Sequence, residues 1–121
     1  MKKILIMDDD DFLREALLEI INFFGYEVEE ATNGEEAIEK FKKNNFSLVI
    51  MDLTISKGMG GKDAIKKILE INPKAKVIVT SGDPSDPIMT EYKKYGFIDI
   101  LKKPFKVEDL KEIIEKALLD N

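Results

Sequence analysis

The sequence predicts an α/β fold in which five parallel strands form one doubly wound sheet and a helix follows each strand, a (βα)5 arrangement. Short apolar runs rich in β-branched residues alternate five times with longer stretches whose apolar residues recur every three or four positions. Three of the short runs are almost continuously hydrophobic, which is typical of parallel strands covered on both faces. Right-handed crossovers wind such units into an open sheet with helices on both sides.

Five segments have the length and composition of strands. They are Ile4 to Met7, Glu27 to Ala31, Ser47 to Met51, Lys76 to Thr80 and Ile98 to Leu101. The first, third and fourth are the nearly continuous apolar runs, so we expect them to be covered on both faces.

Apolar residues at helical spacing predict a helix after each strand. The first contains Phe12, Leu13, Ala16, Leu17, Ile20, Ile21 and Phe24, and Gly25 marks its end. The next three contain Ala37, Ile38 and Phe41, then Ala64, Ile65, Ile68 and Leu69, then Ile88, Met89 and Tyr92. The last contains Val107, Leu110, Ile113, Ile114, Ala117 and Leu118.

Length and composition narrow the possible functions. With 121 residues, 44% hydrophobic and 36% charged, residues 1–121 are expected to form one globular domain. The absence of cysteine excludes thiolate chemistry, and the absence of histidine excludes a phosphohistidine relay within the chain. A net charge of −5 argues against nucleic-acid binding by this domain alone. The apolar runs are too short to span a membrane, and a cytoplasmic location is expected.

Reactive side chains follow four of the five expected strands. They are Asp8 to Asp11 after the first, Asp52 after the third, Thr80 and Ser81 at the end of the fourth, and Lys103 after the fifth. Alone, each has an ordinary explanation as a helix cap, turn residue or solvated charge, and Asp10 and Asp11 are expected to be caps. However, ligands bind at the carboxyl ends of strands in such sheets. Four features that meet at one edge therefore predict a functional site.

This set of side chains suits phosphoryl chemistry on a carboxylate. Clustered carboxylates repel one another unless a divalent cation lies among them, and Mg²⁺ prefers such oxygen ligands. A carboxylate beside the metal can attack phosphorus. The metal, a lysine and a hydroxyl can then neutralise the phosphoryl oxygens.

The order of these motifs resembles that of response-regulator receiver domains, which have a flavodoxin-like, CheY-like fold. The resemblance runs from Lys3 to about Leu119 and rests on Ile4 to Asp10, Leu48 to Leu53, Ser81-Gly82 and Lys103-Pro104-Phe105. It implies a phosphoacceptor domain of a two-component system. The implied partner is a sensor histidine kinase or a histidine phosphotransfer domain, and the implied cofactor is Mg²⁺.

The resemblance also implies a role for each matching residue. Asp52 matches the phosphoacceptor. Asp9 and Asp52 match direct Mg²⁺ ligands, Asp8 matches a ligand acting through water, and the backbone carbonyl of Thr54 completes the metal site. Ser81 matches the switch hydroxyl, with Thr80 as the competing candidate, and Lys103 matches the lysine that contacts the acyl phosphate.

The chain departs from the family pattern in two places. Many receivers carry a proline where this chain has Ser56, so its loop is expected to be less rigid. Ile100 stands where many receivers have Tyr or Phe, so output by rotation of an aromatic ring is not expected. The glycine-rich loop and the segments Thr80 to Pro84 and Lys94 to Phe97 look most like receivers of hybrid sensor kinases.

Three alternative functions fit the sequence less well. An unphosphorylated interaction module on the same fold would lack the acceptor chemistry. A phosphatase-like hydrolase would carry its aspartate nucleophile after the first strand and need an inserted cap domain, for which there is no room. A flavodoxin-like cofactor binder would need a phosphate-binding loop after the first strand, and none is present.

Overall fold

A five-stranded parallel sheet forms the centre of the computed structural model, which describes residues 2–119. The strands are β1 (Lys3–Met7), β2 (Glu27–Ala31), β3 (Leu48–Asp52), β4 (Val77–Ser81) and β5 (Asp99–Lys102). Their order across the sheet is β2-β1-β3-β4-β5, and every neighbouring pair is parallel. The expected doubly wound α/β fold is therefore confirmed.

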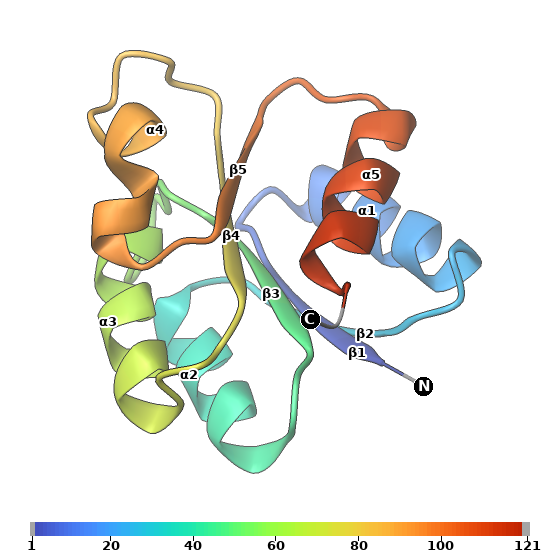
Figure 1. The fold of residues 1–121 in the computed structure, drawn as a ribbon, viewed down its shortest axis with the longest axis horizontal. Coiled ribbons are helices and arrows are strands. Elements are labelled where there is room, and N and C mark those ends of the chain that lie inside the picture. The colour runs from blue at the N-terminus through green and yellow to red at the C-terminus, as the bar shows by residue number, and fades with distance from the viewer. Residues whose placement is uncertain (1, 120–121) are drawn as a thin grey trace.

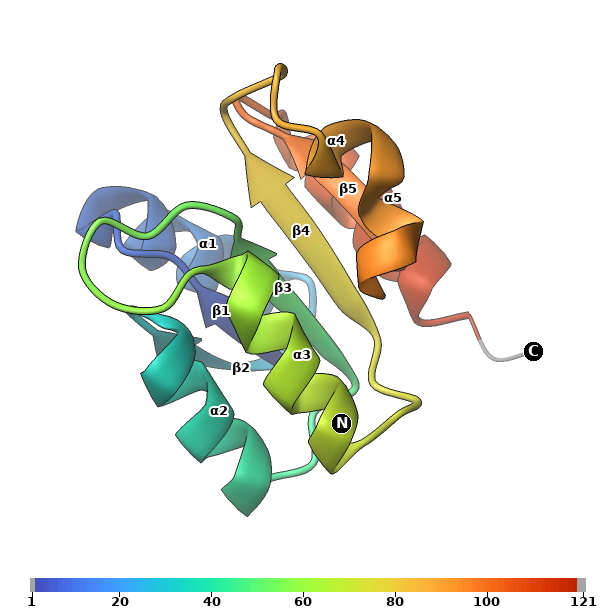
Figure 2. The same ribbon diagram turned by 90° about the vertical axis from the view of Figure 1, so that its left-hand side faces the viewer.

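Helices cover both faces of this sheet. They are α1 (Asp11–Phe23), α2 (Gly34–Lys43), α3 (Gly61–Ile71), α4 (Ile88–Glu91) and α5 (Val107–Ala117), with a 3₁₀ helix η1 (Tyr92–Tyr95) directly after α4. In Figures 1 and 2, α1 and α5 lie on one side of the sheet, whereas α2, α3 and α4 lie on the other. This three-layer arrangement buries the three inner strands, β1, β3 and β4, almost completely.

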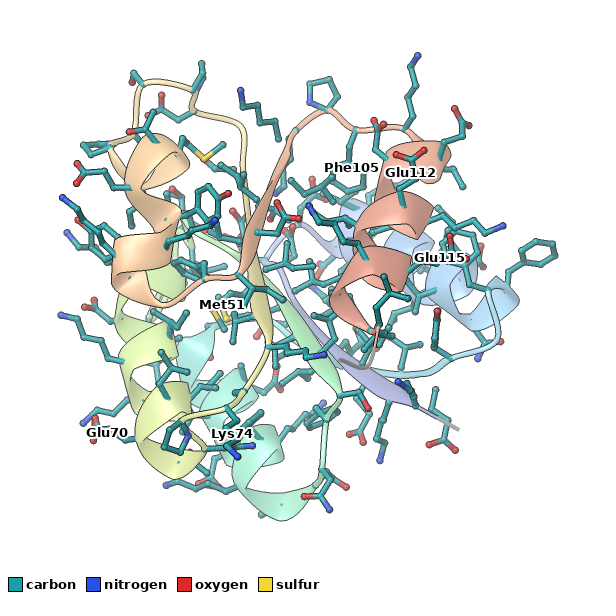
Figure 3. All side chains as sticks on the ribbon, viewed as in Figure 1. Met51, Glu70, Lys74, Phe105, Glu112 and Glu115 are labelled. Atoms are coloured by element: carbon teal, nitrogen blue, oxygen red, sulfur yellow. The ribbon has the colours of Figure 1, made fainter. Side chains whose placement is uncertain are left out.

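Alternate residues of the central strands build the two halves of the core. Leu5 and Met7 of β1 pack on the α2 and α3 side, whereas Ile4 and Ile6 pack against α1 and α5. The same alternation continues in β3, where Met51 lies inside the molecule in Figure 3. Because burying one such side chain stabilises the fold by roughly 1.5–3 kcal/mol, these strands are firmly held. Residues at their carboxyl ends consequently have fixed positions.

Three of the expected strands begin and end one residue later than predicted. β3, β4 and β5 thus end at Asp52, Ser81 and Lys102. The fourth helix is shorter than its apolar pattern indicates, because α4 has only four residues before the chain tightens into η1. Gly96, with φ of 102°, then ends this segment. These changes leave the order of elements as predicted.

Phe12 is a correction to the predicted pattern of the first helix. Its spacing grouped it with the apolar stripe of α1, yet its side chain is 85% exposed. The packed stripe begins one residue later, at Leu13, and continues through Leu17 and Ile21. Gly25, with φ of 100°, follows the helix as expected. Within residues 2–119, no helix is both long and apolar enough to cross a membrane.

Candidate functional site

Three aspartates meet at the carboxyl ends of the two central strands. Asp8 and Asp9 follow β1, and Asp52 ends β3, which pairs with β1 so that Met7 lies beside Met51. One carboxylate oxygen from each aspartate lies within 4.8 Å of the others. Asp8 is 2% exposed and Asp52 6% exposed. The expected acidic cluster is thus present, and two of its members are removed from most of the solvent.

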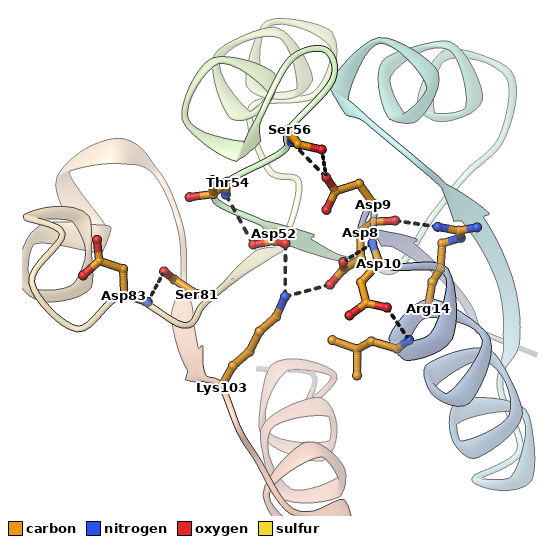
Figure 4. A network of polar contacts seen from close by, with 11 residues as sticks. Asp8, Asp9, Asp10, Arg14, Asp52, Thr54, Ser56, Ser81, Asp83 and Lys103 are labelled. Carbon is orange, nitrogen blue, oxygen red and sulfur yellow. Dashed lines mark hydrogen bonds and ion pairs between the residues drawn. The ribbon is translucent and has the colours of Figure 1, made fainter.

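Lys103 supplies the positive charge of this cluster. It follows β5, and its Nζ donates hydrogen bonds to Oδ2 of Asp8 at 2.9 Å and Oδ2 of Asp52 at 3.1 Å. Figure 4 shows the lysine reaching across the site to both carboxylates. Buried charges are tolerated when they are paired and hydrogen-bonded. The ammonium of Lys103 therefore explains how the carboxylates of Asp8 and Asp52 can both be buried.

Asp9 is held differently from the other two aspartates. Its Oδ2 accepts hydrogen bonds from the backbone N–H and the hydroxyl of Ser56, both at 2.8 Å. Ser56 lies in the loop after β3, and the two residues are 47 positions apart in the sequence. The contact therefore joins the loop after β3 to the end of β1 (Figure 4).

The backbone at Asp8 is fixed by Arg14, the only arginine of the sequence. Its Nη1 donates to the carbonyl oxygen of Asp8 at 2.8 Å, while Nε and Nη2 donate to Glu30 and Asp11, each at 2.7 Å. The planar guanidinium presents its N–H donors from three separate nitrogen atoms in a fixed fork, so it can serve these three acceptors at once. Asp10 caps α1, as expected, by accepting the N–H of Leu13 at 3.1 Å.

The pKa shifts follow from these contacts. Burial raises the pKa of the Asp52 carboxyl, although the charge of Lys103 acts in the opposite direction. Burial lowers the pKa of Lys103, but its hydrogen bond to Asp8 and the charge of Asp52 outweigh this effect and the pKa is raised. The backbone N–H of Ser56 lowers the pKa of Asp9. Lys103 and Asp9 are therefore charged at neutral pH.

The remaining predicted residues lie at the same edge. The N–H of Thr54 donates to Oδ1 of Asp52 at 3.3 Å, which places this residue beside the cluster. Ser81 ends β4, and its hydroxyl accepts the N–H of Asp83 at 3.1 Å. Thr80, the competing candidate, pairs with Asp52 in the sheet. Both hydroxyl residues are buried. Figure 4 shows Ser81 on the Asp83 side of the site, with Asp52 hydrogen-bonded to Lys103 and Thr54 instead.

The donor set fits Mg²⁺. Three carboxylates offer hard oxygen ligands within one small volume. The cluster is accessible to solvent at Asp9, its half-buried member. A divalent cation there would offset the mutual repulsion of the carboxylates. The side chains of the cluster offer only carboxylate oxygens, and the sequence has neither cysteine nor histidine, so the site favours a hard cation.

Two residues that contact the cluster, Ser56 and Arg14, were not predicted. Ser56 was recognised only as a residue in place of a proline. A serine in a loop gives no indication in the sequence that it contacts a residue 47 positions away. Arg14 carried one signal, since it is a single arginine among 19 basic residues, just after the acidic run.

Comparison with known proteins identifies relatives of this chain. A family model described as the response regulator receiver domain matches residues 4–115. The chemotaxis protein CheY of Thermotoga maritima is 44% identical over 117 residues, which are 96% of this chain and 97% of that protein.

Two solved structures show the same fold. The CheY-like receiver domain protein of Methanospirillum hungatei has a TM-score of 0.90 at 30% identity, covering 98% of this chain and 94% of that one. The response regulator TrrA of Thermotoga maritima, solved in complex with Mg(2+)-BeF, has a TM-score of 0.86 at 32% identity, covering 98% and 100%.

These relatives do not test the expected likeness to receivers of hybrid sensor kinases, which stays a prediction. The family itself is shown, because its model spans most of the chain and a similar relative covers nearly all of it. The chain belongs to the response regulator receiver domain family, the CheY-like signalling module of two-component systems.

Proposed function

We propose that the chain, as one receiver domain over residues 1–121, accepts a phosphoryl group on Asp52 with the help of Mg²⁺. The observation that carries the proposal is the pairing of the buried Asp52 carboxylate with Lys103, beside two further carboxylates. A nucleophilic carboxylate, a fixed cation and a metal-binding cluster are the parts that phosphoryl transfer to an aspartate requires.

The phosphoryl donor is a phosphohistidine of a sensor histidine kinase or a histidine phosphotransfer domain. A carboxylate oxygen of Asp52 attacks phosphorus, the P–N bond breaks, and the imidazole nitrogen leaves with the electron pair and regains a proton. The donor must come from a partner, since this sequence has no histidine.

Each residue of the site has its own role in the proposed transfer. Asp8, Asp9, Asp52 and the carbonyl of Thr54 would hold the metal, which when bound neutralises charge on the transferred phosphoryl oxygens. Lys103 already donates a hydrogen bond to Asp52 and would contact a phosphoryl oxygen on that residue. Ser81, whose hydroxyl oxygen accepts the N–H of Asp83, can turn its own O–H towards another phosphoryl oxygen and donate to it.

The comparisons support this proposal in two ways. The related TrrA was solved with Mg(2+)-BeF bound, and the related chemotaxis protein is of similar length. We infer that the output is a protein–protein contact and that this domain does not bind nucleic acid or membrane. The cytoplasmic location and the identity of the downstream target stay predictions.

The test is phosphorylation by a small acyl-phosphate donor, followed by intact-protein mass. Wild type with Mg²⁺ should gain one phosphoryl group, which then decays because acyl phosphates hydrolyse. Asp52→Asn should gain none, and excess chelator should suppress the reaction. Asp63→Asn, at an exposed aspartate of α3, should react like wild type. Full yield in Asp52→Asn would contradict the assignment, and no reaction with any donor would favour the unphosphorylated module.

A further inference from the structure

The loop between β3 and α3 is fixed to two other parts of the molecule. At one end, Ser56 donates both its N–H and its hydroxyl to Asp9. At the other end, the N–H of Met59 donates to Oε1 of Glu35 at 2.8 Å, and the N–H of Gly34 donates to the Met59 carbonyl at 2.7 Å. The loop is therefore tied to the first turn of α2 and to the end of β1.

The first of these contacts depends on the residue type at position 56. Proline, which many receivers carry there, has no N–H and no hydroxyl, so it could make neither hydrogen bond to Asp9. Serine makes both, at 2.8 Å each. The expected loss of rigidity without proline is thus countered by direct contacts of the loop, one of which ends on a residue of the acidic cluster.

Both hydrogen bonds reach the same oxygen of Asp9. A carboxylate oxygen has two lone-pair sites, so Oδ2 is fully used by Ser56. The other oxygen, Oδ1, faces the side where Asp8 and Asp52 lie (Figure 4). Ser56 thereby sets the orientation of the whole carboxylate and leaves one oxygen directed at the cluster.

We propose that Ser56 is a positioning residue for a divalent cation. Ser56 holds Oδ2 of Asp9 and so leaves Oδ1 of Asp9 as the metal ligand. The inference rests on the proposed metal site. Hydrogen bonds to the outer atoms of a ligating carboxylate reduce the reorganisation needed on binding, and losing such a partner typically weakens metal affinity by about 10–100-fold. Because Ser56 is exposed, the lower end of that range applies.

Calorimetric titration with Mg²⁺ alone tests this role. Ser56→Ala keeps the N–H but removes the hydroxyl, and it should weaken Mg²⁺ binding by on the order of tenfold. Ser56→Thr, which restores the hydroxyl, should return the affinity to near the wild-type value. Ser85→Ala is the matched control, because Ser85 also donates its N–H and hydroxyl to one carboxylate oxygen, on Asp83, outside the cluster. It should bind Mg²⁺ like wild type.

A second readout separates positioning from competition. If Ser56 holds Oδ2 while Oδ1 binds the metal, the Ser56 amide proton stays protected from solvent exchange when Mg²⁺ saturates the protein. Unchanged affinity in Ser56→Ala would overturn the proposal. Tighter binding, with loss of amide protection on Mg²⁺ addition, would also overturn it and show that Ser56 competes with the metal. Wild-type affinity in Asp9→Ala would instead refute the proposed metal site itself.

Discussion

The Nζ atom of Lys103 lies 3.1 Å from Oδ2 of Asp52, while Oδ1 of the same carboxylate accepts the N–H of Thr54 at 3.3 Å. Each oxygen of Asp52 thus has one donor of its own. The ammonium and the amide hold the carboxylate in one orientation. A second bond from the ammonium to Asp8 places the lysine between two buried acids.

Replacing Lys103 should therefore destabilise the protein in the absence of metal. Lys103→Met leaves Asp8 and Asp52 buried without a counter-charge, and the free energy of unfolding should fall by about 2–3 kcal/mol, less than for a fully buried pair because the lysine is partly exposed. Mg²⁺ should restore part of the loss. Urea denaturation with and without Mg²⁺ measures both values. Lys102→Met, at the exposed neighbour, is the control, and equal losses in the two variants would contradict the assigned pairing.

Asp9→Ala should abolish stabilisation of the fold by Mg²⁺. A ligand that binds only the folded state raises its stability by mass action, and this variant removes a proposed ligand. Without metal, the free energy of unfolding should change by less than about 1 kcal/mol, because relief of carboxylate repulsion offsets the lost bonds to Ser56. Thermal melts over a Mg²⁺ series give both results. An equal shift of the melting temperature in variant and wild type would show that the metal binds elsewhere.

Arg14→Lys should also weaken the structure around Asp8, although it keeps the positive charge. The lysine can replace only part of the contacts to the Asp8 carbonyl, Glu30 and Asp11, so unfolding free energy should fall by about 1–2 kcal/mol. Urea denaturation provides the value. Glu30→Gln, which removes one negative charge but keeps an oxygen that can accept from Nε of Arg14, should cost less. A fully stable Arg14→Lys protein would show that the charge matters and the fork does not.

Most of the cluster could be predicted because it depends on strand ends. Asp8, Asp52 and Lys103 each follow a short apolar run, and parallel strands bring such positions to one edge whatever the loops do. Buried strands are also the segments whose sequence pattern is least ambiguous. The fold and the charged centre of the site follow from the same signal.

What could not be predicted depends on loops and on single side-chain orientations. The bond from Ser56 to Asp9 needs a loop path that no periodicity describes, and it is made by exposed atoms. Phe12 satisfied the helical spacing, but the pattern cannot tell which of two adjacent apolar residues starts the buried stripe. α4 was overestimated because Tyr92, the third apolar residue of the predicted pattern, packs against the core from the 3₁₀ helix η1, not from α4.

Binding of duplex DNA should be absent at physiological salt. The net charge is −5, and binding to the phosphate backbone depends on basic side chains that release counterions. Fluorescence anisotropy with a labelled duplex measures this, with bovine serum albumin as an acidic reference protein. Salt-sensitive binding in the micromolar range would contradict the prediction.

The response to a phosphoryl group should spread from Ser81 rather than along β5. The Ser81 hydroxyl oxygen accepts the N–H of Asp83, and Figure 4 shows it on the Asp83 side of the site. When Ser81 moves its hydroxyl towards a phosphoryl oxygen to donate to it, the bond from Asp83 lengthens and the segment 82–87 loses an anchor. Ile100 is branched at Cβ, stiff at χ1 and already packed against the core on the α3 side, so it cannot report the event by a large rotation. Beryllofluoride with Mg²⁺, a stable phosphoryl mimic, should therefore shift amide resonances in 82–87 and 54–61 more than in 98–101.

Two variants make this last prediction sharp. Asp52→Asn with the same additions should show no such shifts, which ties them to the acceptor. Ile100→Tyr supplies a ring three residues before Lys103, and its strand should then respond to the mimic where the wild-type strand does not. If the largest wild-type shifts centre on Ile100 and β5, the signal leaves the site along that strand after all. In that case the hydrogen bond between Asp83 and Ser81 has no part in the switch.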